Sequence, residues 1–305
     1  MWIVALDGSE ISFRALRLVT FLMNPKHVLK GVHDNVVVIT VLKPGETEAS
    51  KNHILNDARV KLIKCGVGDF NIRTKAITLP DGWEVGDALV YFANHAHMGR
   101  SASSHFVLGA QGIDKAATGG SKMAHLGSIA EQCLAKVKVP VTIVKNAWGT
   151  KHADCDGLGR PVRVGHDGNP KSGLHIACAV DGTFTSDAAF DLAASLCREG
   201  DTLSAVFVMG TGSDRRATMC ESNYTIECAK VGESRKLKQC EFVKVVLGKG
   251  GSVAKALVEI GKDCDVLVMG SVELTKIEKR HVLGSVAMGI AKHAPCHLCV
   301  AKNYA

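Results

Sequence analysis

The chain has 305 residues, of which 46% are hydrophobic and 22% charged, and its formal net charge is +7. This length is enough for roughly two domains. No apolar run reaches the ~18 residues that span a bilayer, and no patch of Lys and Arg is interleaved with aromatic residues, so we expect neither a membrane nor a nucleic acid as a partner.

Strands and helices alternate along the first 146 residues. The segment 35–42 is a continuous apolar run, which is typical of a parallel sheet covered on both faces. Ser9 or Ser12 could cap the first helix, and Asp81 is placed to cap the third. Strands are expected at 2–7, 35–42, 70–79, 104–109 and 141–145, and helices at 9–23, 46–65, 83–95 and 127–137. This order predicts an α/β domain with a doubly wound parallel sheet of five strands.

Residues 147–172 form the expected linker between two domains. The segment is rich in Gly and Pro and has no apolar periodicity. It contains His152, Asp154, Cys155 and His166, whose side chains are of metal-binding types. Their spacing matches no zinc pattern, so any metal stays unknown.

Residues 173–305 repeat the order of the first half. Strands are expected at 175–181, 202–209, 241–247, 265–269 and 296–302, and helices at 186–198, within 218–238, at 252–261 and at 284–293. Ala5-Leu-Asp-Gly-Ser9 corresponds to Ala179-Val-Asp-Gly-Thr183, and Leu126-Gly-Ser-Ile-Ala130 corresponds to Leu283-Gly-Ser-Val-Ala287. A duplication at this long period predicts two similar domains, 1–146 and 173–305.

The segment from the fourth strand to the last helix of each half suits a phosphate group. In the second half the strand ends at Gly270 and Gly284-Ser285 opens the helix, and in the first half Gly109 precedes Gly127-Ser128. Bare amide N–H groups, the positive end of the helix dipole and a serine hydroxyl all favour an anion. The alternative is that each glycine only permits a turn and each serine only caps a helix.

Together these motifs resemble the universal stress protein family, and the resemblance covers both halves. It implies two tandem flavodoxin-like domains that pair through their last strands as an intramolecular pseudo-dimer, with a homodimer also possible. Members of the family that bind ATP carry Gly-x2-Gly-x9-Gly-Ser/Thr in this loop. The carboxyl ends of the strands, where such a loop lies, are also where open α/β sheets generally bind their ligands.

The resemblance assigns nucleotide-binding roles to residues of both copies, although neither copy keeps the motif intact. In the second copy Glu273 stands at the second glycine and ten residues precede Gly284, whereas in the first copy fourteen residues separate Gly112 from Gly127. Because the second loop departs less from the family length, we expect the second copy to be the better site. The expected nucleotide-binding residues are Asp7, Val41, Gly109, Gly112, Gly127 and Ser128 in the first copy, and Asp181, Val208, Gly270, Gly284, Ser285 and Val286 in the second.

These features predict a regulatory protein of the stress response that binds an adenine nucleotide, ATP or AMP, with Mg²⁺ as an open question. Slow ATP hydrolysis or autophosphorylation is the most that the resemblance implies, since no catalytic base is identified. The chain has an odd number of cysteines, 11, and its first strand begins at Trp2 with no signal peptide before it, so we expect a reduced, cytoplasmic setting. The alternatives are a scaffold of the same fold that binds no nucleotide, and a nucleotide-binding α/β transferase.

Overall fold

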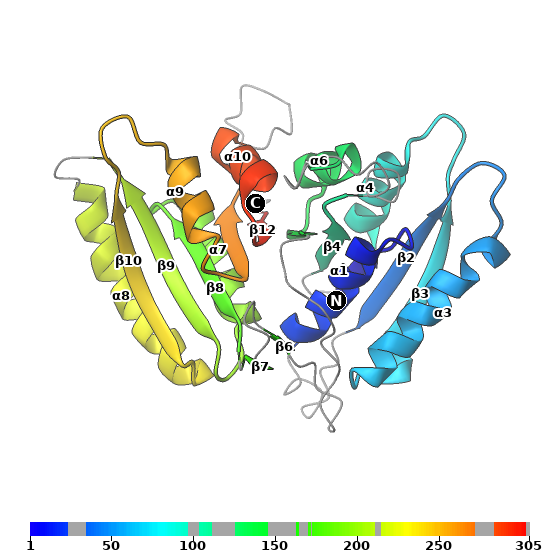
Figure 1. Cartoon of the computed structure of the whole chain (residues 1–305), viewed down its shortest axis with the longest axis horizontal. Coiled ribbons are helices and arrows are strands. Elements are labelled where there is room, and N and C mark those ends of the chain that lie inside the picture. Colours follow the sequence, from blue (N-terminus) through cyan, green and yellow to red (C-terminus); the bar gives the residue numbers. More distant parts are fainter. Residues whose placement is uncertain are drawn as a thin grey trace. The chain divides into compact units, whose positions relative to one another are not determined.

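In a computed structural model, the chain divides into two compact units, Met1–Asn169 and Pro170–Ala305 (Figure 1). The structure describes residues 1–23, 35–96, 104–111, 126–145, 163–164, 170–171, 173–210, 215–271 and 284–302. Most of the expected linker therefore lies outside the described residues, and its four candidate metal ligands lie there too. Two short strands, β6 (Arg163–Val164) and β7 (Pro170–Lys171), fall within it.

The first unit is a parallel sheet in the order β3-β2-β1-β4-β5. A short 3₁₀ turn at Asp69–Asn71 precedes β3, so Phe70 lies outside the strand in which we expected it and is exposed. The elements are β1 (Trp2–Ala5), α1 (Glu10–Leu22), β2 (Val36–Leu42), α3 (Glu48–Lys64), β3 (Ile72–Thr78), α4 (Val85–His95), β4 (His105–Gly109), α6 (Ser128–Lys136) and β5 (Val141–Val144).

The second unit repeats this topology with the order β10-β9-β8-β11-β12, again parallel. Its elements are β8 (His175–Val180), α7 (Phe184–Leu196), β9 (Thr202–Met209), α8 (Arg215–Arg235), β10 (Gln239–Val246), α9 (Val253–Ile260), β11 (Val266–Gly270), α10 (Ser285–His293) and β12 (His297–Ala301). The prediction of two doubly wound α/β sheets is confirmed. The predicted pairing of the domains through their last strands stays a prediction.

The core of each unit is formed by strands that are buried on both faces. In β1 all four residues are buried, and β4 and β11 are buried along their first four residues. Strands β3 and β10, at the outer end of each order, instead alternate between exposed and less exposed residues. Within the described ranges, none of the helices combines the length and the apolar character that crossing a membrane requires.

The helix starts show where local chemistry sets the fold. Ser9 caps α1 by accepting a hydrogen bond from the Ser12 amide at 3.1 Å, so of the two expected caps the structure selects Ser9. The expectation that Asp81 caps the third helix, expected at 83–95, is wrong. Gly82 has φ +74°, and the Trp83 amide donates to the Pro80 carbonyl, so a turn occupies this stretch. Helix α4 therefore begins later, with Glu84 as its cap and Asp87 completing a capping box.

Both units place their first strand at a topological switch point. Strand β1 lies between β2 and β4, and β8 lies between β9 and β11, so the chain winds one way from the first strand and then the other. In open α/β sheets, ligands bind in the crevice outside the carboxyl ends of the strands at such a point. The fold thus directs attention to the ends of β1, β2 and β4 and of their counterparts in the second unit.

Candidate functional site

The loop after the first strand has the same construction in both units. The Asp7 side chain accepts a hydrogen bond from the Ser9 amide at 2.9 Å, and the Asp181 side chain accepts one from the Thr183 amide at 3.0 Å. The residue in the middle of each turn is a glycine: Gly8 has φ +89° and Gly182 has φ +76°. This backbone conformation favours glycine. The two expected aspartates therefore hold a tight turn at the carboxyl end of the sheet.

The glycine that ends the fourth strand of each unit is explained by packing. A Cβ atom on Gly109 would lie 2.8 Å from Ile11 Cγ2, and one on Gly270 would lie 2.6 Å from the Thr185 carbonyl oxygen. The first turns of α1 and α7 thus pass directly over these strand ends, where only glycine leaves room. Packing alone therefore explains why glycine occupies positions 109 and 270, without reference to a ligand.

The start of α6 presents backbone amides toward the end of the sheet. The Gly127 amide is engaged, since it donates to the Ala110 carbonyl oxygen at 2.7 Å, so it does not serve as the bare donor that the sequence led us to expect. The amides of Ser128, Ile129 and Ala130 come next, and no acceptor for them occurs among the described residues. Such first-turn amides, with the helix dipole behind them, favour an anion.

These groups line one cavity of about 400 Å³ at the carboxyl ends of β1, β2 and β4. The wall contains all the expected first-copy residues that the structure describes: Asp7, Val41, Gly109, Gly127 and Ser128. The sixth, Gly112, lies outside the described residues. A volume of this size falls in the ~300–1,000 Å³ range of small-molecule pockets.

One part of the cavity wall is apolar and another is charged. The larger apolar side chains come from the carboxyl ends of the strands, from the residue after β1 and from helices α4 and α6, and they are Leu6, Val41, Val85, Leu89, Leu108 and Ile129. The charged part consists of Lys43, Glu46 and Lys51, where the Glu46 carboxylate pairs with Lys51 Nζ at 2.8 Å and accepts the Lys43 amide at 2.8 Å. The hydrogen bond from Lys51, and then that from the Lys43 amide, lower the pKa of Glu46.

Sequence reasoning missed this charged part of the wall. Lys43 directly follows β2, and Glu46 and Lys51 flank the start of α3, so the only available signal was their position at the carboxyl end of a strand. No group of three or more metal-binding side chains suited to a metal ion occurs in the described part of the chain.

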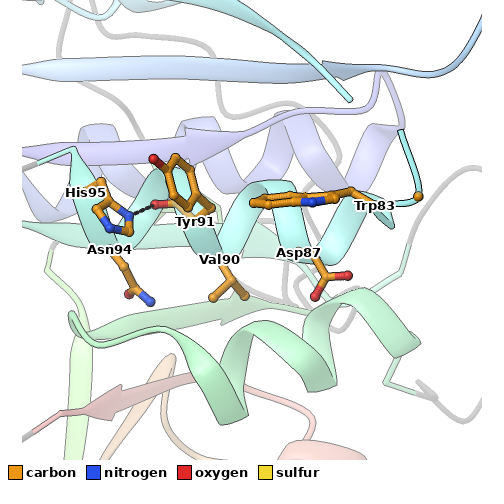
Figure 2. Close-up of a pocket in the computed structure, with 7 residues that line it drawn as sticks. Trp83, Asp87, Val90, Tyr91, Asn94 and His95 are labelled. Carbon is orange, nitrogen blue, oxygen red and sulfur yellow. Dashed lines mark hydrogen bonds between the residues drawn. The ribbon is translucent and has the colours of Figure 1, made fainter. Parts of the chain in front are cut away.

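A second cavity, of about 460 Å³, lies beside α4 (Figure 2). Some of the residues that line it connect α4 to α6. Figure 2 shows Asp87 and Asn94 directed toward α6 and the Trp83 and Tyr91 rings directed away from it. Asp87 accepts from Gln132 Nε2 at 2.5 Å, while Asn94 accepts from the Lys138 amide at 2.7 Å. These bonds fix the spacing of α4 and α6, which are two of the helices that line the cavity.

The second unit places its expected residues along the corresponding edge of the sheet. Asp181 follows β8 and is exposed, Val208 is half-buried near the end of β9, and Gly270 ends β11. Gly284 is the N-cap of α10, whose first two residues are Ser285, exposed, and Val286, half-buried. The loop with Glu273 lies outside the described residues.

Helix α8 lies close to this edge. A Cβ atom on Gly182 would lie 2.8 Å from Cys220 Sγ of that helix, so the turn after Asp181 is packed against α8.

Comparison with known proteins shows which family the second unit resembles. The sequence model of the family described as Usp, Universal stress protein family, matches residues 174–302. This match covers nearly the whole second unit, which is therefore similar to the universal stress protein family along its length. The first unit has the same topology, the same Leu-Gly-Ser motif, and Asp-Gly-Ser where the second unit has Asp-Gly-Thr, so the chain contains this fold in tandem.

Two solved structures that cover nearly the whole chain agree with it at the level of the fold. A universal stress protein from Archaeoglobus fulgidus is 17% identical, with 99% of this chain and 96% of that chain covered and a TM-score of 0.52. The cytoplasmic domain of a prokaryotic cation chloride cotransporter is 8% identical, with 99% and 95% covered and a TM-score of 0.51. UspA from Lactobacillus plantarum matches 43% of this chain at 17% identity, with all of its own chain covered and a TM-score of 0.34. A comparison with curated proteins gave no significant match.

Proposed function

We propose that the first unit binds an adenine nucleotide, ATP or AMP, in the cavity at the ends of β1, β2 and β4. The observation that carries the proposal is that Asp7, Val41, Gly109, Gly127 and Ser128, which the resemblance singled out at four separate places in the sequence, line one cavity. Its volume of about 400 Å³ suits a ligand of this size. The chain would act as a cytoplasmic, regulatory member of the stress response.

The composition of the wall suggests how the nucleotide would lie. The adenine ring would pack against the apolar side chains of Val41, Val85 and Leu89. The Asp7 side chain, which lines the cavity, would lie beside the ribose hydroxyls. The phosphates would lie at the start of α6, where the amides of Ser128, Ile129 and Ala130 and the positive end of the helix dipole favour negative charge.

The carboxylates of the cavity favour binding over rapid turnover. Asp7 is held by the Ser9 amide, and Glu46 is held by both Lys51 and the Lys43 amide, with a lowered pKa. A carboxylate with a lowered pKa is a weak general base at neutral pH. We therefore propose that any ATP hydrolysis or autophosphorylation is slow, and that the nucleotide acts as a signal.

The second unit is proposed as the weaker site or as a scaffold that binds no nucleotide. The sequence favoured this unit because of its loop length. Two observations favour the first unit as the tighter site: Cys220 packs against Gly182 in the second unit, and residue 273 is glutamate where the motif has glycine. Whether Mg²⁺ accompanies the nucleotide stays open in this proposal.

Photolabelling with 8-azido-ATP tests the location of the base. After irradiation and proteolysis, the labelled peptides should come from the segments around β2 and α4, and excess ATP should prevent the labelling. Label found only on peptides of the second unit would contradict the proposed site, and label that ATP does not displace would contradict specific binding.

A further inference from the structure

Helix α8 of the second unit carries a buried row of side chains that includes two cysteines. Ala217, Cys220, Tyr224 and Cys228 recur at helical spacing and are all buried. Tyr224 fixes this face against α7, because its hydroxyl donates to Asp187 Oδ1 at 2.6 Å. Cys228 lies one turn further along and interacts with Cys240 near the start of β10.

The second cysteine of the pair, Cys240, is the second residue of β10. Gly232, one turn after Cys228 on the same face of α8, packs directly on it, and a Cβ atom on Gly232 would lie 3.2 Å from Cys240 Cβ. The Cys228 and Cys240 thiols share a hydrogen bond. The two residues differ in burial, since Cys228 is 2% exposed whereas Cys240 is half-buried.

The shared hydrogen bond makes the two thiols chemically unequal. With Cys228 as the donor, it lowers the pKa of the Cys240 thiol below its ordinary value. The same bond, followed by burial, raises the pKa of Cys228. Cys240 is therefore the less buried residue of the pair and the one whose thiol forms a thiolate more readily, and Cys228 is a buried thiol next to it. This arrangement is typical of a redox-sensitive cysteine beside a resolving cysteine.

We propose that Cys240 and Cys228 form a hydroperoxide-sensitive dithiol that closes to a disulfide. The Cys240 thiolate attacks the outer oxygen of a hydroperoxide, ROOH, whose O–O bond breaks. Cys240 becomes a sulfenic acid, and the leaving alkoxide takes up a proton and departs as ROH. The Cys228 sulfur then attacks the sulfenic sulfur, an S–S bond forms, and water leaves. Two thiols lose two electrons, the hydroperoxide gains them, and α8 becomes covalently tied to β10.

A second thiol pair in the same unit provides a matched control. Cys264 and Cys296 also share a hydrogen bond, but they are 7% and 2% exposed, so neither is open to a peroxide. The hydrogen bond to Cys296, followed by burial, raises the pKa of Cys264. If proximity of two thiols were enough, both pairs would oxidise alike. If an accessible thiolate is required, only Cys228 and Cys240 react.

The test is to treat the full-length reduced protein with hydrogen peroxide and to map its disulfides by mass spectrometry after alkylation of free thiols. A Cys228–Cys240 disulfide should form more than about tenfold faster than any product of Cys264 or Cys296, since reaction rate follows thiolate fraction and access. Formation of a Cys264–Cys296 disulfide at a similar rate, or pairing of Cys240 with Cys197 instead, would overturn the proposal.

Two conservative variants separate the two chemical steps. Cys228→Ser should leave Cys240 as a sulfenic acid that dimedone labels, whereas Cys240→Ser should leave Cys228 unmodified under the same conditions. Circular dichroism checks that both variants fold, and the mapping of the unmutated protein stands even if one does not. Oxidation of Cys228 in Cys240→Ser at the original rate would show that Cys240 is not the reacting thiol, and the proposal would fail.

Discussion

The substitution Ser128→Asp separates nucleotide binding from folding. Ser128 is the exposed first residue of α6, directly after the N-cap Gly127. An aspartate there interacts favourably with the helix dipole, by about 0.3–1 kcal/mol, so the free energy of unfolding should stay the same or rise. The same carboxylate would lie beside the proposed phosphates and repel them.

The size of the repulsion follows from Coulomb's law. Two unit charges about 5 Å apart interact by about 1–3 kcal/mol for an effective dielectric constant between that of water and that of a protein surface. This corresponds to a loss of roughly 5- to 150-fold in ATP affinity. Adenosine has no phosphate, so its affinity should change much less.

The matched control is Ser285→Asp, at the same position of α10 in the second unit. Ser285 is also the exposed first residue of its helix, after the N-cap Gly284. Isothermal titration of each full-length variant with ATP and with adenosine gives the comparison. If Ser285→Asp loses ATP affinity and Ser128→Asp keeps it, the phosphates lie in the second unit, and our assignment of the site is wrong.

Three further predictions concern folding. Gly270→Ala should lower the free energy of unfolding by about 1–3 kcal/mol in urea titration, because the new Cβ would lie 2.6 Å from a backbone oxygen, whereas Gly248→Ala, with no atom within 4 Å of its Cβ, should change it little. Tyr224→Phe should cost about 1–2 kcal/mol through the lost hydrogen bond to Asp187, and an unchanged urea midpoint would contradict that role. Burial lowers the pKa of His105 from 6.5 to about 3, so the unfolded chain binds the extra proton between these values and stability should fall as pH drops from 6.5 toward 3. His105→Gln should flatten this part of the pH profile, and an equally steep profile would refute the assignment.

The topology could be predicted from the sequence because local and long-range patterns agreed. The apolar run that became β2 is too continuous for a half-exposed strand, and β2 is indeed largely buried between β1 and β3. The duplication added a second, independent copy of each signal. The helix that we expected to start at residue 83 begins at Val85. A turn that includes Gly82 and the Pro80 carbonyl occupies the preceding residues, so Asp81 does not cap the helix. The amino-acid composition of this stretch does not reveal which of the two structures forms.

The candidate site could be predicted only in part. Asp7 and Val41 were recoverable because each stands at the end of a strand in a recognisable motif. The structural reason for Gly109 and Gly270 could not be predicted, because it depends on the short distance between each strand end and the first turn of α1 or α7. The pair of Glu46 and Lys51 was also missed, because an ion pair between a loop and the following helix has no signature apart from the cavity that it lines.

The most direct test of the proposed site is a calorimetric titration of ATP into the full, unmodified chain, with a parallel titration of a Val41→Glu variant. Val41 is half-buried in the cavity wall at the position proposed for the adenine ring, so the variant should remove binding of both ATP and adenosine. We predict saturable binding of ATP at one site per chain, lost in the variant. A chain that binds no ATP at millimolar concentration, or a variant that binds as tightly as the original, would contradict the account.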